Sequence, residues 1–470
     1  MLSFCNAVRG RDVLITGVGA VCPLGMNLPE IWSRLLAGES ACRRLHSHEL
    51  PGGDRLPATP GFPLNGAFVN HALTRQQFPH LPLTGRLTPN QRAAVLSEPV
   101  LTMTAVALHE AASQAGLVWP MPDAGRVSVL FGGSKGGLAT AERLVGSLRH
   151  SRRAAQVMAS SRAIIATTDG SSDLGCWNEP DTSQPVMCSV EDDFSGPFEH
   201  AFTTDSAARI IAQMTGAEGP QVCPVAACAT GLISVLQGAA MIHSGQSDLC
   251  IVGSADAALR ASVVSSFNRL QVLSRQTEAA HACRPFDRDR DGFVIGDGAA
   301  VLILESRRHA RRRGARPLAQ VLGGGWLCDP TGITQIDESG RVIAELLQRS
   351  AAAIGHAPHV LSVHGTGTES NDLAEGRGIQ RAFEANLPVC FGIKGASGHL
   401  LGAAGSLETA VVAAGIRSGS HPGTRNFHHA DPRCLIPIAA QPRPVSPRAV
   451  WGKISLGFGG HAACGLFGSG

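Results

Sequence analysis

The sequence predicts an α/β protein in which mostly parallel sheets are covered on both faces by helices. Strand patterns and helix patterns alternate along the 470 residues, which is typical of parallel strands joined by crossover helices. Only 16% of the residues are charged and 55 are glycine, which favours a compact, buried architecture over a disordered or fibrous one. With 44% hydrophobic residues, the chain is long enough to bury a large core.

The individual elements follow from apolar runs and the glycines that end them. Residues 13–21 predict a buried strand that ends in a glycine turn, and residues 31–36 predict a short helix. Longer helices are predicted at 101–115 and 205–215. Further short apolar runs predict strands at 127–131, 249–253, 299–304, 360–363, 389–393 and 450–456.

One segment differs in character from the rest. It contains a polar stretch at 167–178 and an acidic run at 191–193. A long irregular segment inside a compact domain is usually a lid, an insertion or disorder. We therefore expect residues 146–200 to form a surface insertion or lid.

Composition argues against several classes of function. The net charge is only +3, and the densest basic run, 307–313, is typical of a solvated helix, so no nucleic-acid partner is expected. The 13 cysteines contain no C-x-x-C pair, which disfavours a disulfide framework or a zinc ribbon and suits the reducing cytoplasm. We see no secretion signal and no apolar run of about 18 residues, so we expect no membrane span.

Cys228 stands where an apolar approach meets small residues and then an apolar helix. A cysteine at a helix N-terminus feels the positive end of the helix dipole, which lowers the pKa of its thiol. Ala227, Ala229 and Gly231 leave room for a substrate carbonyl and leave backbone N–H groups uncovered, as an oxyanion hole requires. By residue type alone an inert buried cysteine is the commoner outcome, and we keep that interpretation for Cys223.

Two histidines and a lysine stand at the ends of predicted strands or helices. His364 opens a glycine-rich turn directly after an apolar strand, so it is expected to project into a cleft. Lys394 follows another strand, and His399 begins a helix of small residues that can pack closely and carry the imidazole inward. Glu408, on that helix, can reach Lys394. Each histidine alone is more often structural, but two of them with a helix-start cysteine indicate nucleophilic catalysis.

Two other chemistries fit these residues less well. His461 could join the two histidines in a zinc site, but no H-E-x-x-H spacing or acidic ligand accompanies them, so no metal is expected. The glycine-rich run 132–137 resembles a phosphate cradle only superficially, because it lacks the G-x-x-x-x-G-K-[ST] spacing.

Taken together, the motifs resemble the β-ketoacyl-acyl-carrier-protein synthases, in particular the ketoacyl synthase II type. The resemblance covers most of the chain, and several blocks in the family's order make it far more specific than any one motif. The blocks are 15–19, 227–231, 284–287, 291–294, 296–299, 364–368 with Asn371, Asp372 and Glu375, 394–408 and 457–460.

The resemblance implies the thiolase fold, with two similar α/β halves in a five-layer αβαβα arrangement. We place the N-terminal half, which carries Cys228, at residues 10–275 and the C-terminal half, which carries the two histidines, at 276–470. The family usually forms homodimers, and a heterodimer with a related synthase-like subunit stays open. Substrates would be carried on the phosphopantetheine of an acyl carrier protein, with no other cofactor bound.

The resemblance also implies a reaction. Cys228 would take an acyl group from a carrier-protein thioester, and the Cys-His-His set would then decarboxylate a malonyl thioester. The resulting carbanion would attack the acyl-enzyme and release a β-ketoacyl product. His364 and His399 would donate hydrogen bonds to the malonyl thioester oxygen as enolate charge builds.

Supporting roles are implied by position in the family's motifs. Lys394 and Glu408 would hold the histidine network together. The N–H groups of Cys228 and Phe458 would form the oxyanion hole, and Phe458 would also be the pocket gate. Thr366 and Thr368 match positions that contact the pantetheine arm. Asp372 and Glu375 match positions that give structural support.

The chain departs from the family pattern at two places. The gate loop continues into His461 and Ala462, where the family usually has an asparagine. Lys135 falls where the resemblance places an apolar residue that lines the acyl pocket. A buried lysine needs a partner or a lowered pKa, although its stem can also pack while its head reaches solvent. We expect Lys135 to bound or polarise the pocket, so that the substrate is not a plain long fatty chain.

Other functions on the same fold stay open. A non-elongating chain-length partner commonly lacks the active cysteine, so Cys228 with both histidines argues against it. A CoA-dependent thiolase would need Cys464 in the cleft as a second catalytic cysteine. Fatty-acid and polyketide pathways are both open, and an acidic carrier protein is expected to dock near Arg269 and Arg275.

Overall fold

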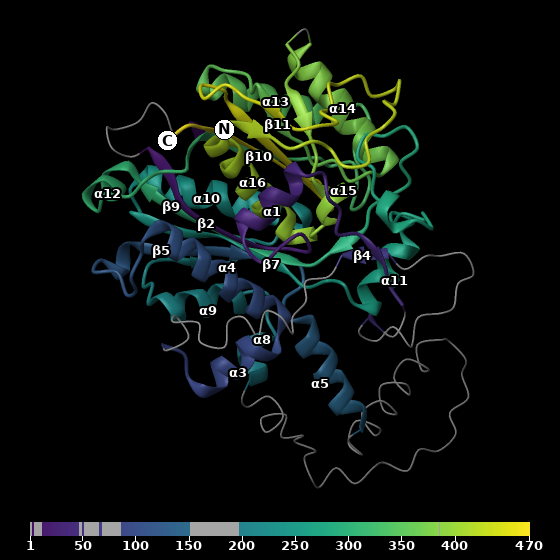
Figure 1. Cartoon of the computed structure of the whole chain (residues 1–470). Coiled ribbons are helices and arrows are strands. Elements are labelled where there is room, and N and C mark those ends of the chain that lie inside the picture. Colours follow the sequence, from purple (N-terminus) through teal and green to yellow (C-terminus); the bar gives the residue numbers. More distant parts are fainter. Residues whose placement is uncertain are drawn as a thin grey trace, which may run out of the picture.

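The computed structural model describes residues 2–3, 12–46, 49–50, 65–67, 86–150, 197–384 and 386–470. Among the described residues, one continuous set of 11 hydrogen-bonded strands divides into two parts, called here the first and the second sheet. They lie one above the other, with helices between them and on both outer faces (Figure 1). The order of layers is helix, sheet, helix, sheet, helix. The five-layer α/β arrangement expected from the resemblance is therefore confirmed. The expectation of mostly parallel sheets is wrong, because six of the ten strand pairings in this set are antiparallel.

Four strands of the first sheet are buried along their whole length, and a short exposed strand lies at its edge. Its strands, in spatial order, are β2 (Val13–Val21), β9 (Gly298–Ser306), β7 (Leu249–Asp256), β5 (Val127–Gly132) and β6 (Gln221–Val222). Helices α4 (Pro99–Ala115) and α9 (Ser206–Thr215) cover its outer face. Helix α4 lies very close to β2, because a Cβ at Gly19 would stand only 2.0 Å from the carbonyl oxygen of Ala107.

The second sheet carries the C-terminal part of the chain. Its strands, in spatial order, are β12 (Val389–Phe391), β11 (Val360–Ser362), β15 (Trp451–Gly457), β16 (His461–Gly468) and β10 (Ala319–Cys328), with β1 (Leu2–Ser3) paired to β10. Helices α13 (Arg341–Ile354) and α14 (Glu369–Phe383) pack on its outer face. The two sheets are joined where residues 319–321 of β10 pair with residues 13–15 of β2.

Two central helices, α10 (Thr230–Ser244) and α16 (Ala404–Ser418), fill the layer between the sheets. They touch at their first turns: a Cβ at Gly231 would lie 2.3 Å from the nitrogen of Ser406, and one at Gly405 would lie 2.6 Å from the nitrogen of Leu232. Only glycine permits so close an approach. The segments that directly precede these two helices are thereby brought to one place.

Helix α10 is apolar enough to resemble a membrane-spanning helix in a hydropathy scan. Within the described part of the chain, the stretch Ala227–Ser244 is the one helix long and apolar enough to cross a membrane. Its place between the two sheets, with 61% of it buried, is that of a core helix.

The remaining elements surround the layers. They are α1 (Leu28–Leu36), β3 (Arg43–Arg44), β4 (Asn65–Ala67), α3 (Pro89–Ser97), α5 (Leu138–His150), α8 (Pro197–Ala201), α11 (Ala261–Arg269), β8 (Ile295–Gly296), α12 (Arg307–Arg312), α15 (Lys394–Ser397), β13 (Ser420–His421), β14 (Arg443–Pro444) and the 3-10 turns Ala124–Arg126, Ala227–Ala229, Ala279–His281 and Leu401–Ala403. Helix α1 begins three residues before its predicted start, because Asn27 caps it and accepts a hydrogen bond from the nitrogen of Glu30 at 2.9 Å.

Two predictions about domain organisation, the insertion at 146–200 and the division at 275/276, are not tested by the structure. The insertion expected at 146–200 lies outside the described residues, apart from the end of α5 and the short helix α8. The division at 275/276 also remains a proposal. Strand β9 follows that boundary in the sequence yet pairs with β2 and β7 of the first sheet.

Candidate active site

A cavity of about 810 Å³, counted with its open mouth, lies where the central helices begin. Its wall collects side chains that are far apart in the sequence. Six of the predicted site residues line it: Cys228, His364, Thr366, Thr368, His399 and Phe458. The cavity therefore brings the predicted nucleophile and both predicted histidines into one chamber.

Cys228 lies in a tight 3-10 turn immediately before α10. Ala227 adopts a positive φ of 46°, which few residues other than glycine do, and the side chain of Thr230 clamps the turn. The hydroxyl of Thr230 accepts from the nitrogen of Ala226 at 2.9 Å and donates to the carbonyl of Ala227 at 2.7 Å. Gly457 leaves the approach to the Cys228 nitrogen open, because a Cβ there would stand only 3.1 Å from it.

The expected lowering of the Cys228 pKa is wrong for the free protein. Burial raises the pKa of this thiol to about 11, although the charges of Lys135 and Lys394 act in the opposite direction. The physical reason is that removal from water penalises the thiolate more than the surrounding cations stabilise it. The resting form of the predicted nucleophile is therefore the neutral thiol, which would release its proton in an attack on a substrate.

The two histidines face each other at right angles. Their ring centroids lie 5.4 Å apart with an interplanar angle of 81°. Nδ1 of His364 lies 3.4 Å from the ammonium of Lys394, and Nδ1 of His399 accepts from the nitrogen of Leu401 at 3.3 Å. Since both neighbours are donors, each Nδ1 is an acceptor, and a neutral ring must carry its proton on Nε2.

Both rings are neutral. Burial lowers the pKa of His364 and of His399 well below 6.5, and the charge of Lys394 lowers both further. The site therefore offers two uncharged Nε2–H donors in a buried chamber. Such donors stabilise an oxyanion that forms between them and do not themselves supply a free acid.

Two buried carboxylates hold the loop that carries His364. Glu375 accepts from the backbone nitrogens of His364 at 2.6 Å and Gly365 at 2.8 Å. Asp372 accepts from the nitrogens of Phe286 at 2.7 Å and Gly367 at 3.2 Å. Burial raises the pKa of Glu375 to about 7. Both carboxylates bind backbone, in keeping with the structural positions that the resemblance assigned to them.

Lys394 and Glu408 form an ion pair, as expected. Glu408 also pairs with a second lysine, Lys453, to which sequence analysis assigned no role. The Lys394 ammonium donates to Glu408 Oε1 at 2.5 Å and to the carbonyl of His364. Lys453, on β15, forms an ion pair with the other oxygen, Glu408 Oε2, at 2.8 Å. It also donates to the carbonyls of Val363 at 3.3 Å and Ile454. The sequence contains three lysines, Lys135, Lys394 and Lys453, and this rarity is the one signal that could have drawn attention to Lys453.

Phe458 belongs to the loop between β15 and β16. Its ring stacks against the ring of Phe267 on α11, and the two ring centroids lie 6.3 Å apart. The loop turns through Gly459 and Gly460, with φ values of 84° and 78°. Thr366 and Thr368 contact each other through their hydroxyls at 2.8 Å on the same cavity wall. Lys135 is half-buried beside Phe267 but is not part of that wall.

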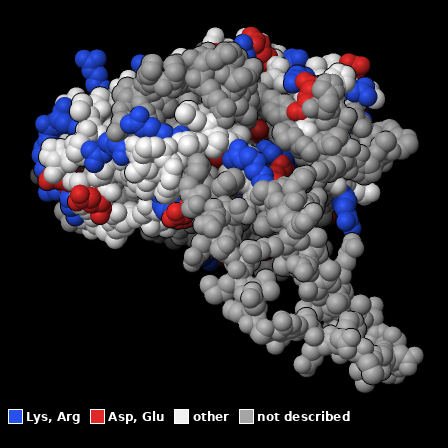
Figure 2. Space-filling view, turned by 90° about the horizontal axis from the view of Figure 1, so that it is seen from below, with Lys and Arg blue, Asp and Glu red and all other residues white. Residues whose placement is uncertain are grey.

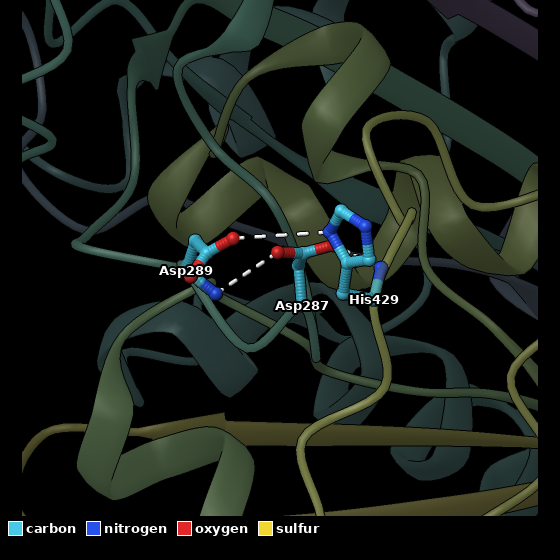
Figure 3. Close-up of side chains that lie close together, drawn as sticks. All are labelled: Asp287, Asp289 and His429. Carbon is cyan, nitrogen blue, oxygen red and sulfur yellow. Dashed lines mark hydrogen bonds and ion pairs between the residues drawn. The ribbon is translucent and has the colours of Figure 1, made fainter.

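The alternatives based on zinc and on a second cysteine gain no support from the geometry. His461 lines the cavity, but within the described residues the one cluster with metal-ligand spacing is Asp287, Asp289 and His429 (Figure 3). The Asp287 carboxylate in that cluster accepts from backbone nitrogens of residues 428, 429 and 289 at 2.7, 2.8 and 2.9 Å, so it serves as a loop clamp. Cys464 is fully buried in β16 and does not line the cavity.

Comparison with known proteins agrees with this geometry. The model "Beta-ketoacyl synthase, N-terminal domain" matches residues 10–168 and 172–310, and the model "Beta-ketoacyl synthase, C-terminal domain" matches residues 318–428. A 3-oxoacyl-[acyl-carrier-protein] synthase 2 of Mycobacterium bovis is 34% identical over 57% of this chain and 65% of its own, so the match spans slightly less than two thirds of that relative. An oxytetracycline polyketide putative beta-ketoacyl synthase 1 of Streptomyces rimosus is 28% identical over 96% of this chain and 95% of its own.

Solved structures show the same fold. A chain from a complex described as a type II PKS acyl-carrier protein with its ketosynthase bound to the hexaketide superposes with a TM-score of 0.74. The superposition covers 98% of this chain and 100% of that one, at 22% sequence identity.

Proposed function

Since this chain belongs to the β-ketoacyl synthase family, we propose that it is an acyltransferase that condenses an acyl thioester with a malonyl thioester, with loss of CO2, to give a β-ketoacyl thioester. The observation that carries the proposal is the meeting of one thiol and two neutral Nε2–H donors in one buried cavity. Both substrates would be carried on the phosphopantetheine of an acyl carrier protein. The relatives include fatty-acid and polyketide synthases, and the proposal covers both.

In the first half-reaction, Sγ of Cys228 attacks the acyl carbonyl. A new C–S bond forms, the carrier thiol leaves, and the proton of Cys228 ends on that thiol. The transient oxyanion accepts hydrogen bonds from the backbone nitrogens of Cys228 and Phe458, which border the cavity. Covalent capture divides one difficult step into two easier ones.

In the second half-reaction, the bond between the malonyl carboxylate and its α-carbon breaks, and the electron pair passes into the thioester as an enolate. The Nε2–H groups of His364 and His399 donate to the enolate oxygen. One such donor in a dry site typically contributes about 3–4 kcal/mol. The enolate carbon then attacks the acyl-enzyme carbonyl, the carbon–carbon bond forms and the C–S bond to Cys228 breaks. CO2 departs, and the Cys228 thiolate takes up one proton from solvent to return to the neutral thiol.

The proposal extends to access and partners. Phe458 is the gate between pantetheine channel and acyl pocket, and Thr366 and Thr368 contact the pantetheine arm. An acidic carrier protein docks near Arg269 and Arg275, which are exposed and lie within three residues of the cavity-lining Phe267 and Val272. Where Figure 2 shows described residues, basic and acidic side chains are interspersed, so a local basic site rather than one extended field is expected.

We also propose a dimer, either of two copies or with a related synthase-like subunit, and a cytoplasmic location. Every cysteine in the described part of the chain is free, which agrees with a reducing compartment.

Intact-mass analysis after exposure to acyl-carrier thioesters tests the proposal. Wild-type protein gains one acyl group, Cys228→Ala gains none, and the half-buried Cys223→Ala serves as the matched control that is still acylated. His399→Ala is acylated at Cys228 but decarboxylates malonyl carrier about 10²–10³-fold more slowly, the usual cost of one lost oxyanion donor. Acylation that persists in Cys228→Ala contradicts the assignment.

A further inference from the structure

Lys135 is the one lysine of the chain that stands beside the cavity without being locked in a buried ion pair. The other two, Lys394 and Lys453, share Glu408. Lys135 lies in the turn between β5 and α5, and its ammonium stands 5.8 Å from the ring centroid of Phe267. Phe267 lines the same cavity as Cys228.

The Lys135 ammonium is oriented by one hydrogen bond within the described residues. Its ammonium donates to the hydroxyl of Ser134 at 2.6 Å, and that hydroxyl donates in turn to Asp256 at 2.5 Å. Asp256 is also engaged by the nitrogen of Gly402 at 2.6 Å, in the segment that follows His399. An ammonium has three N–H donors, and within the described residues Lys135 uses one and has no ion-pair partner.

Apolar side chains lie around Cys228, and one of them, Phe267, is the residue that Lys135 faces. Leu138, Phe267 and Val272 pack with Cys228 as half-buried members of one cluster. An acyl chain that runs from Sγ of Cys228 along the Phe267 ring would come near the Lys135 ammonium, which stands 5.8 Å from the centroid of that ring. A methyl end placed there would strip water from the ammonium without returning a hydrogen bond, which is costly. An oxygen acceptor would make a charge-assisted hydrogen bond instead.

We propose that Lys135 selects acyl groups that carry an acceptor oxygen, a carboxylate or a ketone, beyond the thioester carbon that Cys228 captures. This inference rests on the proposed function and defines the class of acyl substrate within it. The ammonium binds the distal oxygen, Phe267 flanks the carbons between the two ends, and plain alkyl chains are disfavoured. Lys135 is thus a specificity-determining residue and takes no part in the bond-making steps.

The test compares rates of Cys228 acylation, measured by intact mass, for thioesters matched in chain length: a plain fatty acyl, an oxoacyl and a dicarboxylic monoacyl group. Wild-type protein is expected to prefer at least one oxygenated acyl group by about tenfold, the effect of one charge-assisted hydrogen bond. Lys135→Met, which keeps the length of the side chain, loses that preference and accepts the plain chain faster. Arg308→Met, which removes an exposed cation on α12 that does not line the cavity, is the control that keeps the wild-type preference.

A second variant separates the two oxygen sources. Lys135→Gln retains a neutral donor, so it keeps a preference for the oxoacyl group and loses one for the carboxylate. Equal rates for all three thioesters in wild type, or an unchanged ratio in both Lys135 variants, overturn the inference while leaving the proposed condensation intact. Failure of wild-type Cys228 to accept any of the thioesters overturns both.

Discussion

Replacement of Lys453 by methionine removes the only charge on β15 that reaches the catalytic network. In the native protein the Lys453 ammonium, which is fully buried, contacts Glu408 Oε2 at 2.8 Å and the carbonyl of Val363 at 3.3 Å. Methionine has nearly the same length and no polar hydrogen. The substitution therefore leaves these acceptors in the core without a partner.

The expected loss of stability can be bounded from these contacts. Breaking a buried ion pair from one side typically costs about 3–5 kcal/mol, because a buried charge is left uncompensated. Glu408 keeps its second cation, Lys394, at 2.5 Å, and the cost of burying the Lys453 ammonium disappears. Both facts favour the lower end of this range, so we expect the free energy of unfolding to fall by about 3 kcal/mol in Lys453→Met.

The functional effect should be selective. Val363 directly precedes His364, and Glu408 holds the lysine that touches the His364 ring. Loss of Lys453 should therefore displace the Nε2–H donor of His364 and slow malonyl decarboxylation. Acylation of Cys228, whose turn is clamped by Thr230, should change little.

Chemical denaturation measures the first effect, and parallel assays of acylation and decarboxylation measure the second. Ser455→Ala is a matched control, because Ser455 is also buried on β15 and its hydroxyl has no hydrogen-bond partner within the described residues. A Lys453→Met protein as stable as Ser455→Ala, with both activities unchanged, would refute the reasoning. Equal loss of both activities would assign Lys453 a purely structural role.

Two further predictions concern pH and docking. Burial depresses the pKa of His364 and His399 below 6.5, so the unfolded chain binds more protons than the folded one below that pH. Stability should fall on acidification, and His399→Gln should flatten the slope by up to about 1.4 kcal/mol per pH unit; identical slopes in denaturant titrations contradict this. Glu375, with its raised pKa, acts in the opposite sense, which is why the variant is compared with wild type. Reversal of charge at Arg269 and Arg275 should weaken carrier-protein binding in a salt-dependent way. The same reversal at exposed Arg308 on α12 should not, and equal affinities for all variants in a titration count against the docking site.

The motifs made much of the site predictable because catalytic groups stand at the ends of elements. An apolar run followed by small residues located Cys228, a glycine turn after a strand located His364, and the start of a small-residue helix located His399. The close packing of Gly231 and Gly405 then explains why these ends meet, since it joins the first turns of α10 and α16.

The protonation state of Cys228 was predicted wrongly from the sequence. The position of Cys228 at a helix start pointed to a lowered pKa, yet burial raises it to about 11. The helix dipole is a local property that a sequence reveals, whereas desolvation depends on everything that covers the thiol. The neutrality of the two histidines has the same origin.

The sequence by itself determined many of the strands and helices, the family motifs and the candidate nucleophile, because each depends on residues close together in the chain. It did not reveal strands β10 and β16 or helices α13 and α14. Only the tertiary structure decided that Lys453 shares Glu408 with Lys394, that both histidines present Nε2–H, and that Lys135 faces Phe267. Those features arise where separate segments meet and exclude water. No spacing along one segment specifies which charges will be neighbours once the two sheets close around the central helices.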